Sequence, residues 1–216
     1  INTESGFSIV KWSGNDTAGA TYPHGFSQAP ELIITKCTNA SVQWIVYSST
    51  VNSTGYLSLT DSFNASRNSW FINNTPPSSS VITSGYSSGT HNDSSHDYIT
   101  YCWHSVPGYS AFGSYEGNQN VNGPFVYTGF RPAFVLTKTI DFPENWTISD
   151  SARSPNNQVD LFLRPDEPTG NTSSAATMDF LSNGFKLRTS DTKTNVSSTI
   201  IYAAFAEQPF TKTTAR

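Results

Sequence analysis

Apolar and polar residues alternate along several short stretches of the chain, which is the pattern of a half-buried β-strand. The clearest stretch is Tyr98–His104, where Ile99, Tyr101 and Trp103 fall on one face. Asn183-Gly184 stands between two apolar segments and predicts a β-hairpin. Long stretches rich in Ala, Leu, Glu and Lys, which would favour helices, are missing. The pattern predicts an all-β chain.

The same pattern predicts about six short strands in each half of the chain. In the first half these are Phe7–Ser13, Glu31–Thr38, Val42–Ser48, Tyr56–Thr60, Val81–Ser84 and Tyr98–His104. In the second half they are Ala111–Tyr115, Ala133–Ile140, Trp146–Ser149, Asp160–Arg164, Met178–Arg188 and Thr199–Ala206. Strands of this spacing favour a jelly-roll-like β-sandwich in each half. We expect the Ser-, Gly-, Asn- and His-rich stretch Pro76–Asp97 to be an exposed loop that flanks the short strand at Val81.

The two halves are also related in sequence, because residues recur in the same order about one hundred positions apart. The pairs are Gly14-Asn15 with Gly117-Asn118, Gly25-Phe26 with Gly129-Phe130, Thr35-Lys36 with Thr137-Lys138, Trp44 with Trp146, Leu57 and Leu59 with Leu161 and Leu163, and Ile99 and Tyr101 with Ile200 and Tyr202. A period of this size indicates two copies of one domain-sized unit. With a tight turn at Val106–Tyr109, we expect a first β-sandwich over residues 1–107 and its pseudo-repeat over residues 108–216.

Composition narrows the possible partners. Charged residues make up 13% of the chain, against roughly 25% in an average soluble protein. The net charge is −4 and the 12 Lys and Arg residues are scattered, so we expect no nucleic-acid partner. The longest apolar run, Ile200–Ala206, is far shorter than the roughly 20 residues of a spanning helix, so we expect no membrane insertion. Because the chain opens on Ile1, we expect a processed product or part of a longer protein.

The chemistry-bearing residues form no recognisable catalytic or metal-binding pattern. Of the acidic candidates Glu116, Asp141, Glu144, Asp150, Asp166 and Glu167, most stand beside Pro, Gly or Asn, as is typical of solvated turns. We also expect no nucleophile elbow of a serine hydrolase. The spacing of His91 and His96 matches no standard zinc pattern, so a solvated loop is the favoured interpretation there. We expect Cys37 and Cys102 to be unbonded, since the second half has Thr139 and Ala203 at the equivalent points. The prediction is a non-enzymatic chain with no catalytic residue, metal or cofactor.

Loops of the first half supply the candidate binding residues, which are Trp70, Phe71, Tyr86, His91 and His96. Trp70 lies among Asn and Ser and has no counterpart in the second half. An aromatic in that setting can stack on a sugar ring or fill an interface pocket. Packing in the core is the competing interpretation for a tryptophan, and the one favoured for Trp44 and Trp146.

Several segments carry a resemblance to a known family. They are Tyr98–Ser105, Pro107–Ser110, Phe112–Tyr115, Asn122–Val135, Asp179–Arg188 and Ile201–Phe210, with weaker matches at His24–Phe26, Pro30 and Lys36. These segments resemble a C-terminal domain of unknown function in tail-fibre and other virion structural proteins of marine bacteriophages. The loops from Asp61 to Asp97 depart from that family, so the choice of ligand cannot be carried over.

The resemblance implies a lectin-like structural protein at the virion surface, in a fibre or decoration module that attaches the particle to its host. Its partners would then be copies of itself, in a trimer or another homo-oligomer, other virion proteins and host-cell polysaccharide. Two alternatives remain. One is a carbohydrate-binding module of a secreted glycoprotein, which the nine Asn-x-Ser/Thr sequons favour; they start at Asn15, Asn39, Asn52, Asn64, Asn73, Asn92, Asn145, Asn171 and Asn195. The other is a polysaccharide depolymerase.

Overall fold

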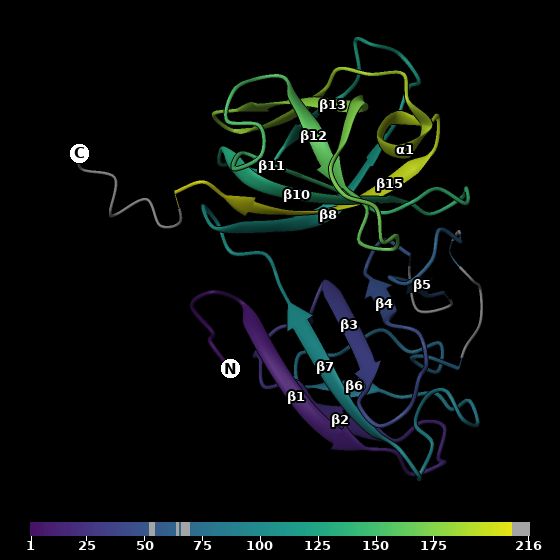
Figure 1. Ribbon diagram of the computed structural model, residues 1–216. Helices are drawn as coiled ribbons and strands as arrows, with labels where there is room; N and C mark the ends of the chain where they lie inside the picture. Colours follow the sequence, from purple (N-terminus) through teal and green to yellow (C-terminus); the bar gives the residue numbers. More distant parts are fainter. Residues whose placement is uncertain (52–54, 64, 66–69, 209–216) are drawn as a thin grey trace. The chain divides into compact units, whose positions relative to one another are not determined.

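The computed structural model describes residues 1–51, 55–63, 65 and 70–208 of the 216-residue chain. Apart from one four-residue helix, α1 (Thr192–Asn195), every regular element in this described part is a β-strand (Figure 1). No helix among these residues has the length and apolar character needed to cross a membrane. The predicted all-β class is confirmed.

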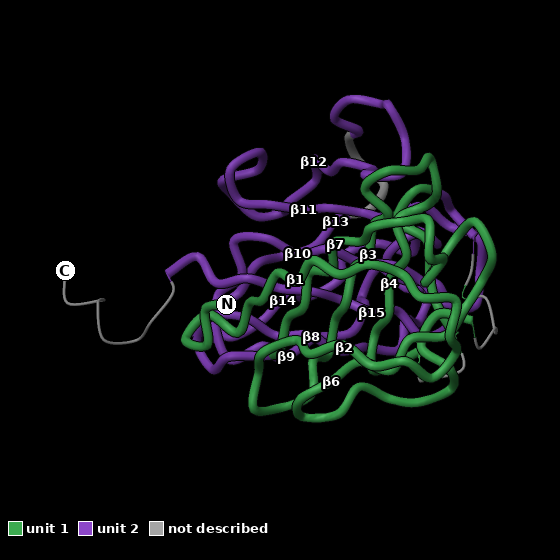
Figure 2. The backbone as a smooth tube through the Cα atoms, turned by 90° about the horizontal axis from the view of Figure 1, so that it is seen from below, with its two compact units in different colours: residues 1–60, 65–104 green, residues 61–64, 105–216 purple. Residues whose placement is uncertain are grey.

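The chain divides into two compact units (Figure 2). Unit 1 comprises Ile1–Thr60 and Ala65–His104, and unit 2 comprises Asp61–Asn64 and Ser105–Arg216. No pattern in the sequence indicated that the short segment Asp61–Asn64, which lies in the first half of the chain, groups with unit 2. Each unit is described by itself below.

Unit 1 contains two sheets. Its strands are β1 (Phe7–Ser13), β2 (Thr21–Pro23), β3 (Leu32–Cys37), β4 (Ile45–Ser48), β5 (Leu57–Ser58), β6 (Val81–Thr83) and β7 (Asp97–Trp103). Five of them form a sheet in the order β1-β7-β3-β4-β5, and β2 pairs with β6 separately. Tyr22 and Ile82 from the small sheet share one core with Ile33 and Ile45 from the large one. Unit 1 is therefore a small two-layer structure.

Unit 2 contains one continuous sheet. Its strands are β8 (Ser110–Glu116), β9 (Phe125–Tyr127), β10 (Pro132–Thr139), β11 (Thr147–Asp150), β12 (Val159–Leu163), β13 (Thr172–Leu181), β14 (Gly184–Leu187) and β15 (Thr199–Ala206), in the order β8-β15-β10-β11-β12-β13-β14-β9. Tyr115 of β8 and Val126 of β9, on the two end strands, share one core. The ring centroids of Tyr115 and Phe185 of β14 are 5.8 Å apart. The sheet is thus nearly closed, where the sequence predicted two packed sheets.

The strand orders of the two units correspond. The order β1-β7-β3-β4-β5 recurs as β8-β15-β10-β11-β12, and the pair β2-β6 recurs as β9-β14. Trp44 directly precedes β4, and Trp146 directly precedes β11. The difference is the ten-residue strand β13, which unit 1 lacks. It pairs with both β12 and β14, so the strands that form two separate sheets in unit 1 form one continuous sheet in unit 2.

Strand pairing corrects one of the sequence matches. Ile99 lies opposite Lys36, and Ile201 lies opposite Lys138. The structure therefore equates Ile99 with Ile201, not with Ile200 as the sequence comparison had it. Ile200 and Ile201 are adjacent isoleucines of β15, so matching by residue type alone placed the alignment one residue out of register.

The repeated Gly-Asn pair marks a loop that is built alike in both units. At Gly14 a β-carbon would lie 2.0 Å from the carbonyl oxygen of Asp93, and at Gly117 it would lie 1.9 Å from that of Val196. A real β-carbon does not come this close to backbone, so each position requires glycine. Asp16 and Gln119 take positive φ angles of 57° and 50°, which shows that the two loops share a backbone course.

A buried asparagine holds each of these loops. Asn92 accepts a hydrogen bond from the Asn15 amide (3.0 Å) and donates to the carbonyls of Thr17 (2.9 Å) and Gly85 (3.0 Å). These bonds bridge the loop after β1 and the segment before β7. Asn92 and Asn195 are 1% and 0% exposed, so their side-chain amides serve the fold.

Asn195 holds the equivalent loop of unit 2 by hydrogen bonds. It accepts from the Asn118 amide (2.9 Å) and donates to the carbonyls of Asn120 (2.8 Å) and Thr189 (2.6 Å) and to Oδ1 of Asn118 (3.0 Å). The side chains of Asn92 and Asn195 therefore stabilise the fold. In this conformation their amide nitrogens are not accessible for attachment of a glycan.

The lysine of the repeated Thr-Lys pair also has a structural role. Lys36 donates to the carbonyl of Val42, and Lys138 donates to that of Glu144 in the equivalent loop. Lys138 is fully buried and also donates to the Ser62 carbonyl at 3.0 Å, within the segment that groups with unit 2. Burial lowers the pKa of Lys138 to about 8. These contacts explain why a lysine recurs at this position.

Further expectations can be compared with the structure. Cys37 and Cys102 are buried and unbonded, as predicted. The hairpin at Asn183-Gly184 is confirmed, with Ser182 and Asn183 in the turn and Gly184 as the first residue of β14. Strand Thr199–Ala206 is confirmed as β15, which lies between β8 and β10.

Other expectations were wrong. The stretch Pro76–Asp97 is not exposed throughout, because Ser84, His91 and Asn92 within it are buried. The sequence also missed β2 and β9, because three residues are too few to show a period of two.

Candidate functional site

The candidate binding residues of the first half divide into a buried group and two residues nearer the surface. Phe71 and His91 are 1% and 0% exposed, and half-buried Trp70 packs on both. Tyr86 is 37% exposed. His96 is half-buried, and its amide donates to the Asp93 carbonyl at 3.0 Å. The structure therefore brings together Trp70, Phe71 and His91, and in this conformation Phe71 and His91 are core residues.

The environment of His91 keeps its imidazole neutral. Nε2 lies 3.0 Å from Oγ of Ser84, and the ring packs among aromatic side chains that include Trp12 and Tyr98. Burial lowers the pKa of His91 to about 3. The sequence predicted a solvated loop here, and this prediction is wrong for His91 because aromatic neighbours bury its ring. The spacing of histidines along the chain cannot indicate such burial.

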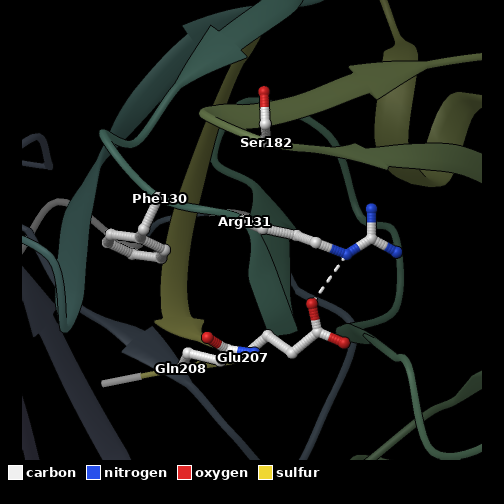
Figure 3. A pocket seen from close by; sticks show the side chains of 5 residues that line it. All are labelled: Phe130, Arg131, Ser182, Glu207 and Gln208. Carbon is white, nitrogen blue, oxygen red and sulfur yellow. Dashed lines mark ion pairs between the residues drawn. The ribbon is translucent and has the colours of Figure 1, made fainter. Parts of the chain in front are cut away.

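Unit 2 contains a surface cavity of about 310 Å³ (Figure 3). It is lined by Phe130, Arg131, Ser182, Glu207 and Gln208. These residues come from three separate segments: the turn between β9 and β10, the β13–β14 hairpin turn, and the residues after β15. We call this cavity the Arg131 pocket.

Backbone hydrogen bonds position the first two segments. The amides of Thr128 and Gly129 donate to the Asn183 carbonyl at 3.0 and 3.2 Å, which joins the β9–β10 turn to the hairpin turn. Gly129 adopts a φ of +83°, a left-handed conformation that glycine takes without strain. The Thr128 hydroxyl donates to the Phe130 carbonyl at 2.7 Å. The pocket wall is therefore held by the backbone before any side chain is considered.

An ion pair forms the polar side of the pocket. Nε of Arg131 lies 2.8 Å from Oε2 of Glu207, and these side chains point toward each other in Figure 3. Arg131 also donates through Nη1 to the Phe180 carbonyl, and the Glu207 amide donates to the Arg131 carbonyl at 2.9 Å. The side chains of Arg131 and Glu207 are 35% and 43% exposed, so both remain accessible to a ligand.

The five described lining residues offer a mixed set of hydrogen-bonding groups whose charges sum to zero. A guanidinium has five N–H donors, so two fixed contacts leave further donors available. Glu207 supplies acceptors, and Ser182 and Gln208 supply both donors and acceptors. Phe130, which is 7% exposed, closes the apolar side. Such a set can bind an uncharged polar ligand in a defined orientation.

Sequence reasoning did not find the Arg131 pocket. Arg131, Ser182 and Glu207 are far apart in sequence, and each alone looks like an ordinary turn or strand-end residue. The usable signals were the glycine at Gly129 and the hairpin at Asn183-Gly184, which do mark its two turns. In the described part of the chain, no group of three or more His, Cys, Asp or Glu residues is arranged to hold a metal ion.

Comparison with known proteins gives a family and no activity. Searches of curated proteins and of solved structures found no match. Residues 1–209 match a family model described as a domain of unknown function, so the match covers both units and the Arg131 pocket. The chain belongs to this family, DUF7483.

Proposed function

We propose that the chain is a non-enzymatic, adhesive structural module at a virion surface, in a fibre or decoration protein that attaches the particle to its host. The observation that carries this proposal is the Arg131 pocket, an accessible polar site on strand ends and turns that the backbone holds in place. Its residues suit recognition: among the described lining residues, Ser182 has no histidine beside it and Glu207 is the one carboxylate. The partners would be copies of the chain, other virion proteins and a host-surface polysaccharide.

The corresponding strand orders support a finer proposal about the fold. We propose that the units are two copies of one ancestral sandwich-like domain, in which β13 later joined the sheets of the second copy. The shared Gly14 and Gly117 contacts and the buried Asn92 and Asn195 support this origin.

The secreted-glycoprotein alternative loses part of its support. Asn92 and Asn195 are buried, and the side-chain amide of Asn145 donates to Asp166 at 3.1 Å and Glu167 at 2.9 Å. The side-chain amide of Asn39 donates to the Ser95 carbonyl at 3.2 Å, so four of the nine sequons have their amide nitrogens engaged within the fold. Sequons at Asn52 and Asn64 lie outside the described residues. Intact mass measurement of the native chain tests this alternative, because attached glycans would favour it.

The proposal is tested by retention on immobilised bacterial envelope polysaccharides. The purified chain should be retained without releasing reducing ends from the polysaccharide. Release of reducing ends would instead support the depolymerase. Light scattering at micromolar concentration tests the assembly, for which we expect a homo-oligomer such as a trimer. A monomer that no envelope polysaccharide retains would refute the proposal.

A further inference from the structure

Beside the Arg131 pocket lies a strand with two exposed aromatic side chains. Phe125 and Tyr127 of β9 are 45% and 68% exposed, while Val126 between them is 6% exposed and lies in the core. Alternate residues of a strand point to the same face, so the two rings stand side by side along β9. Neighbouring exposed apolar side chains often mark a site that binds a ligand or a partner. We call this pair the β9 aromatic strip.

The two rings of the strip lie close to two glycines. A β-carbon on Gly184 would lie 2.1 Å from the Val126 carbonyl oxygen and 3.0 Å from the Phe125 ring. The glycine therefore allows β9 to approach β14 closely and the Phe125 ring to lie over the backbone. The Tyr127 hydroxyl lies 3.6 Å from the β-carbon position of Gly129. Each ring thus lies next to the backbone of a glycine.

The strip and the Arg131 pocket adjoin each other. Tyr127 ends β9, and the next residues, through Phe130 and Arg131, run into the pocket wall. Tyr127 lies opposite Gly184, two residues beyond Ser182 of the pocket. One extended ligand could therefore contact both the strip and the pocket.

Unit 1 supplies an internal comparison. Its strand β2 pairs with β6 as β9 pairs with β14, and both β2 and β9 alternate exposed, buried, exposed. At the positions of Phe125 and Tyr127, β2 has Thr21 and Pro23. The fold therefore forms without these aromatic residues.

Arg131 also lacks a counterpart. The turn that follows Phe26 in unit 1 continues with Ser27-Gln28-Ala29, where unit 2 has Arg131 after Phe130. Scaffold residues such as Gly25 and Gly129 recur, with φ angles of +82° and +83°. Phe125, Tyr127 and Arg131 are therefore accessible residues that unit 1 does not share, as expected for a binding function specific to unit 2.

The chemistry of the combined surface identifies the ligand class. Aromatic rings bind apolar C–H faces, while the pocket supplies donors and acceptors for hydroxyl groups. Glu207 compensates the charge of Arg131, so an anionic ligand would meet a carboxylate beside the one cation among the described residues that line the pocket. Resting on the function proposed above, we propose that unit 2 binds a neutral oligosaccharide, with one sugar in the Arg131 pocket and a neighbouring sugar on the β9 aromatic strip.

The test is isothermal titration of the full chain with neutral oligosaccharides of glucose, galactose, mannose and N-acetylglucosamine. Polygalacturonate and heparin fragments serve as anionic probes. We expect binding to at least one neutral probe and none to the anionic ones. Tyr127→Ala and Arg131→Met should each weaken that binding about tenfold or more, as expected for removal of a central contact.

The matched control is Phe142→Ala, which removes another exposed aromatic side chain of unit 2, 46% exposed in the wild type. It should leave saccharide binding unchanged, and circular dichroism should show all three variants folded. Binding of anionic probes alone, or equal loss with Phe142→Ala, would overturn the proposal.

Two further outcomes separate this proposal from the function above. Retention on envelope polysaccharide that survives Tyr127→Ala and Arg131→Met would leave the adhesive function standing and refute this site. If Tyr127→Ala changes only the oligomeric mass, the exposed edge of β9 is an interface between copies, and the saccharide site is likewise refuted. Failure of both retention and saccharide binding would refute both proposals.

Discussion

Replacing Asn195 with alanine tests the idea that one buried side chain holds the loop after β8. The Asn195 side chain makes four hydrogen bonds, to the Asn118 amide and Oδ1 and to the carbonyls of Asn120 and Thr189. It is fully buried, so alanine leaves a small polar cavity. Asn118 and Asn120 are exposed, and water can replace their lost bonds. Thr189 is buried, and its carbonyl loses this partner.

The expected cost follows from these contacts. A net contribution of about 1 kcal/mol for each lost bond, reduced where water replaces the partner, gives a destabilisation of about 3 kcal/mol. Asn92→Ala removes three bonds in unit 1, of which those to Asn15 and Thr17 can be replaced by water, so we expect about 2 kcal/mol. Asn171→Ala, at an exposed sequon, should change the free energy of unfolding by less than about 0.5 kcal/mol.

Urea denaturation followed by circular dichroism measures these free energies. Hydrogen exchange adds a local readout, because the Gln119 amide bonds to the Asn195 carbonyl and the Asp16 amide to that of Asn92. Exchange should rise in the loop after β8 for Asn195→Ala and in the loop after β1 for Asn92→Ala. An Asn195→Ala protein as stable as Asn171→Ala, with unchanged exchange at Gln119, would refute the reasoning.

Three further predictions concern packing, protonation and thiols. Gly184→Ala places a β-carbon 2.1 Å from a backbone oxygen of β9, so thermal melts should show a loss of about 2 kcal/mol or more, while Gly170→Ala, with open space around it, should melt like the wild type. Because burial lowers the pKa of His91 from 6.5 to about 3, the unfolded chain binds a proton that the folded chain excludes. Stability in urea should therefore fall between about pH 6.5 and 3, by up to about 1.4 kcal/mol per pH unit, and a slope unchanged by His91→Phe would contradict this. A thiol reagent should detect Cys37 and Cys102 in denaturant but neither quickly in the folded chain, since both are buried and burial raises the pKa of Cys102 to about 12; rapid native labelling would count against this.

Local patterns in the sequence determined most of the strands and one hairpin. Alternation over Tyr98–His104 and the Asn183-Gly184 pair act within a few residues, so their physics does not depend on the rest of the fold. The recurrence of Gly14 as Gly117 was also visible, because a backbone contact that excludes a β-carbon tolerates only glycine.

Other features depended on contacts between distant segments. Alternation cannot tell which face of a strand is covered: in β7 the core side is Tyr98, Thr100 and Cys102, while Ile99, Tyr101 and Trp103 are half-buried on the other. The position of β13 in the sheet, which makes unit 2 a single sheet, depends on pairing with two other strands. Neither feature follows from local propensity.

The candidate binding residues show most clearly which features local sequence determines and which depend on the tertiary structure. His91 looked like a solvated polar residue, but aromatic side chains from several elements enclose it and keep it neutral. Arg131, Ser182 and Glu207 looked like unrelated turn and strand-end residues, but the strand order of unit 2 brings them to one cavity. Sequence determined which residues were available, and the tertiary structure alone decided which were buried and which met, because burial and proximity depend on segments that are distant in the chain.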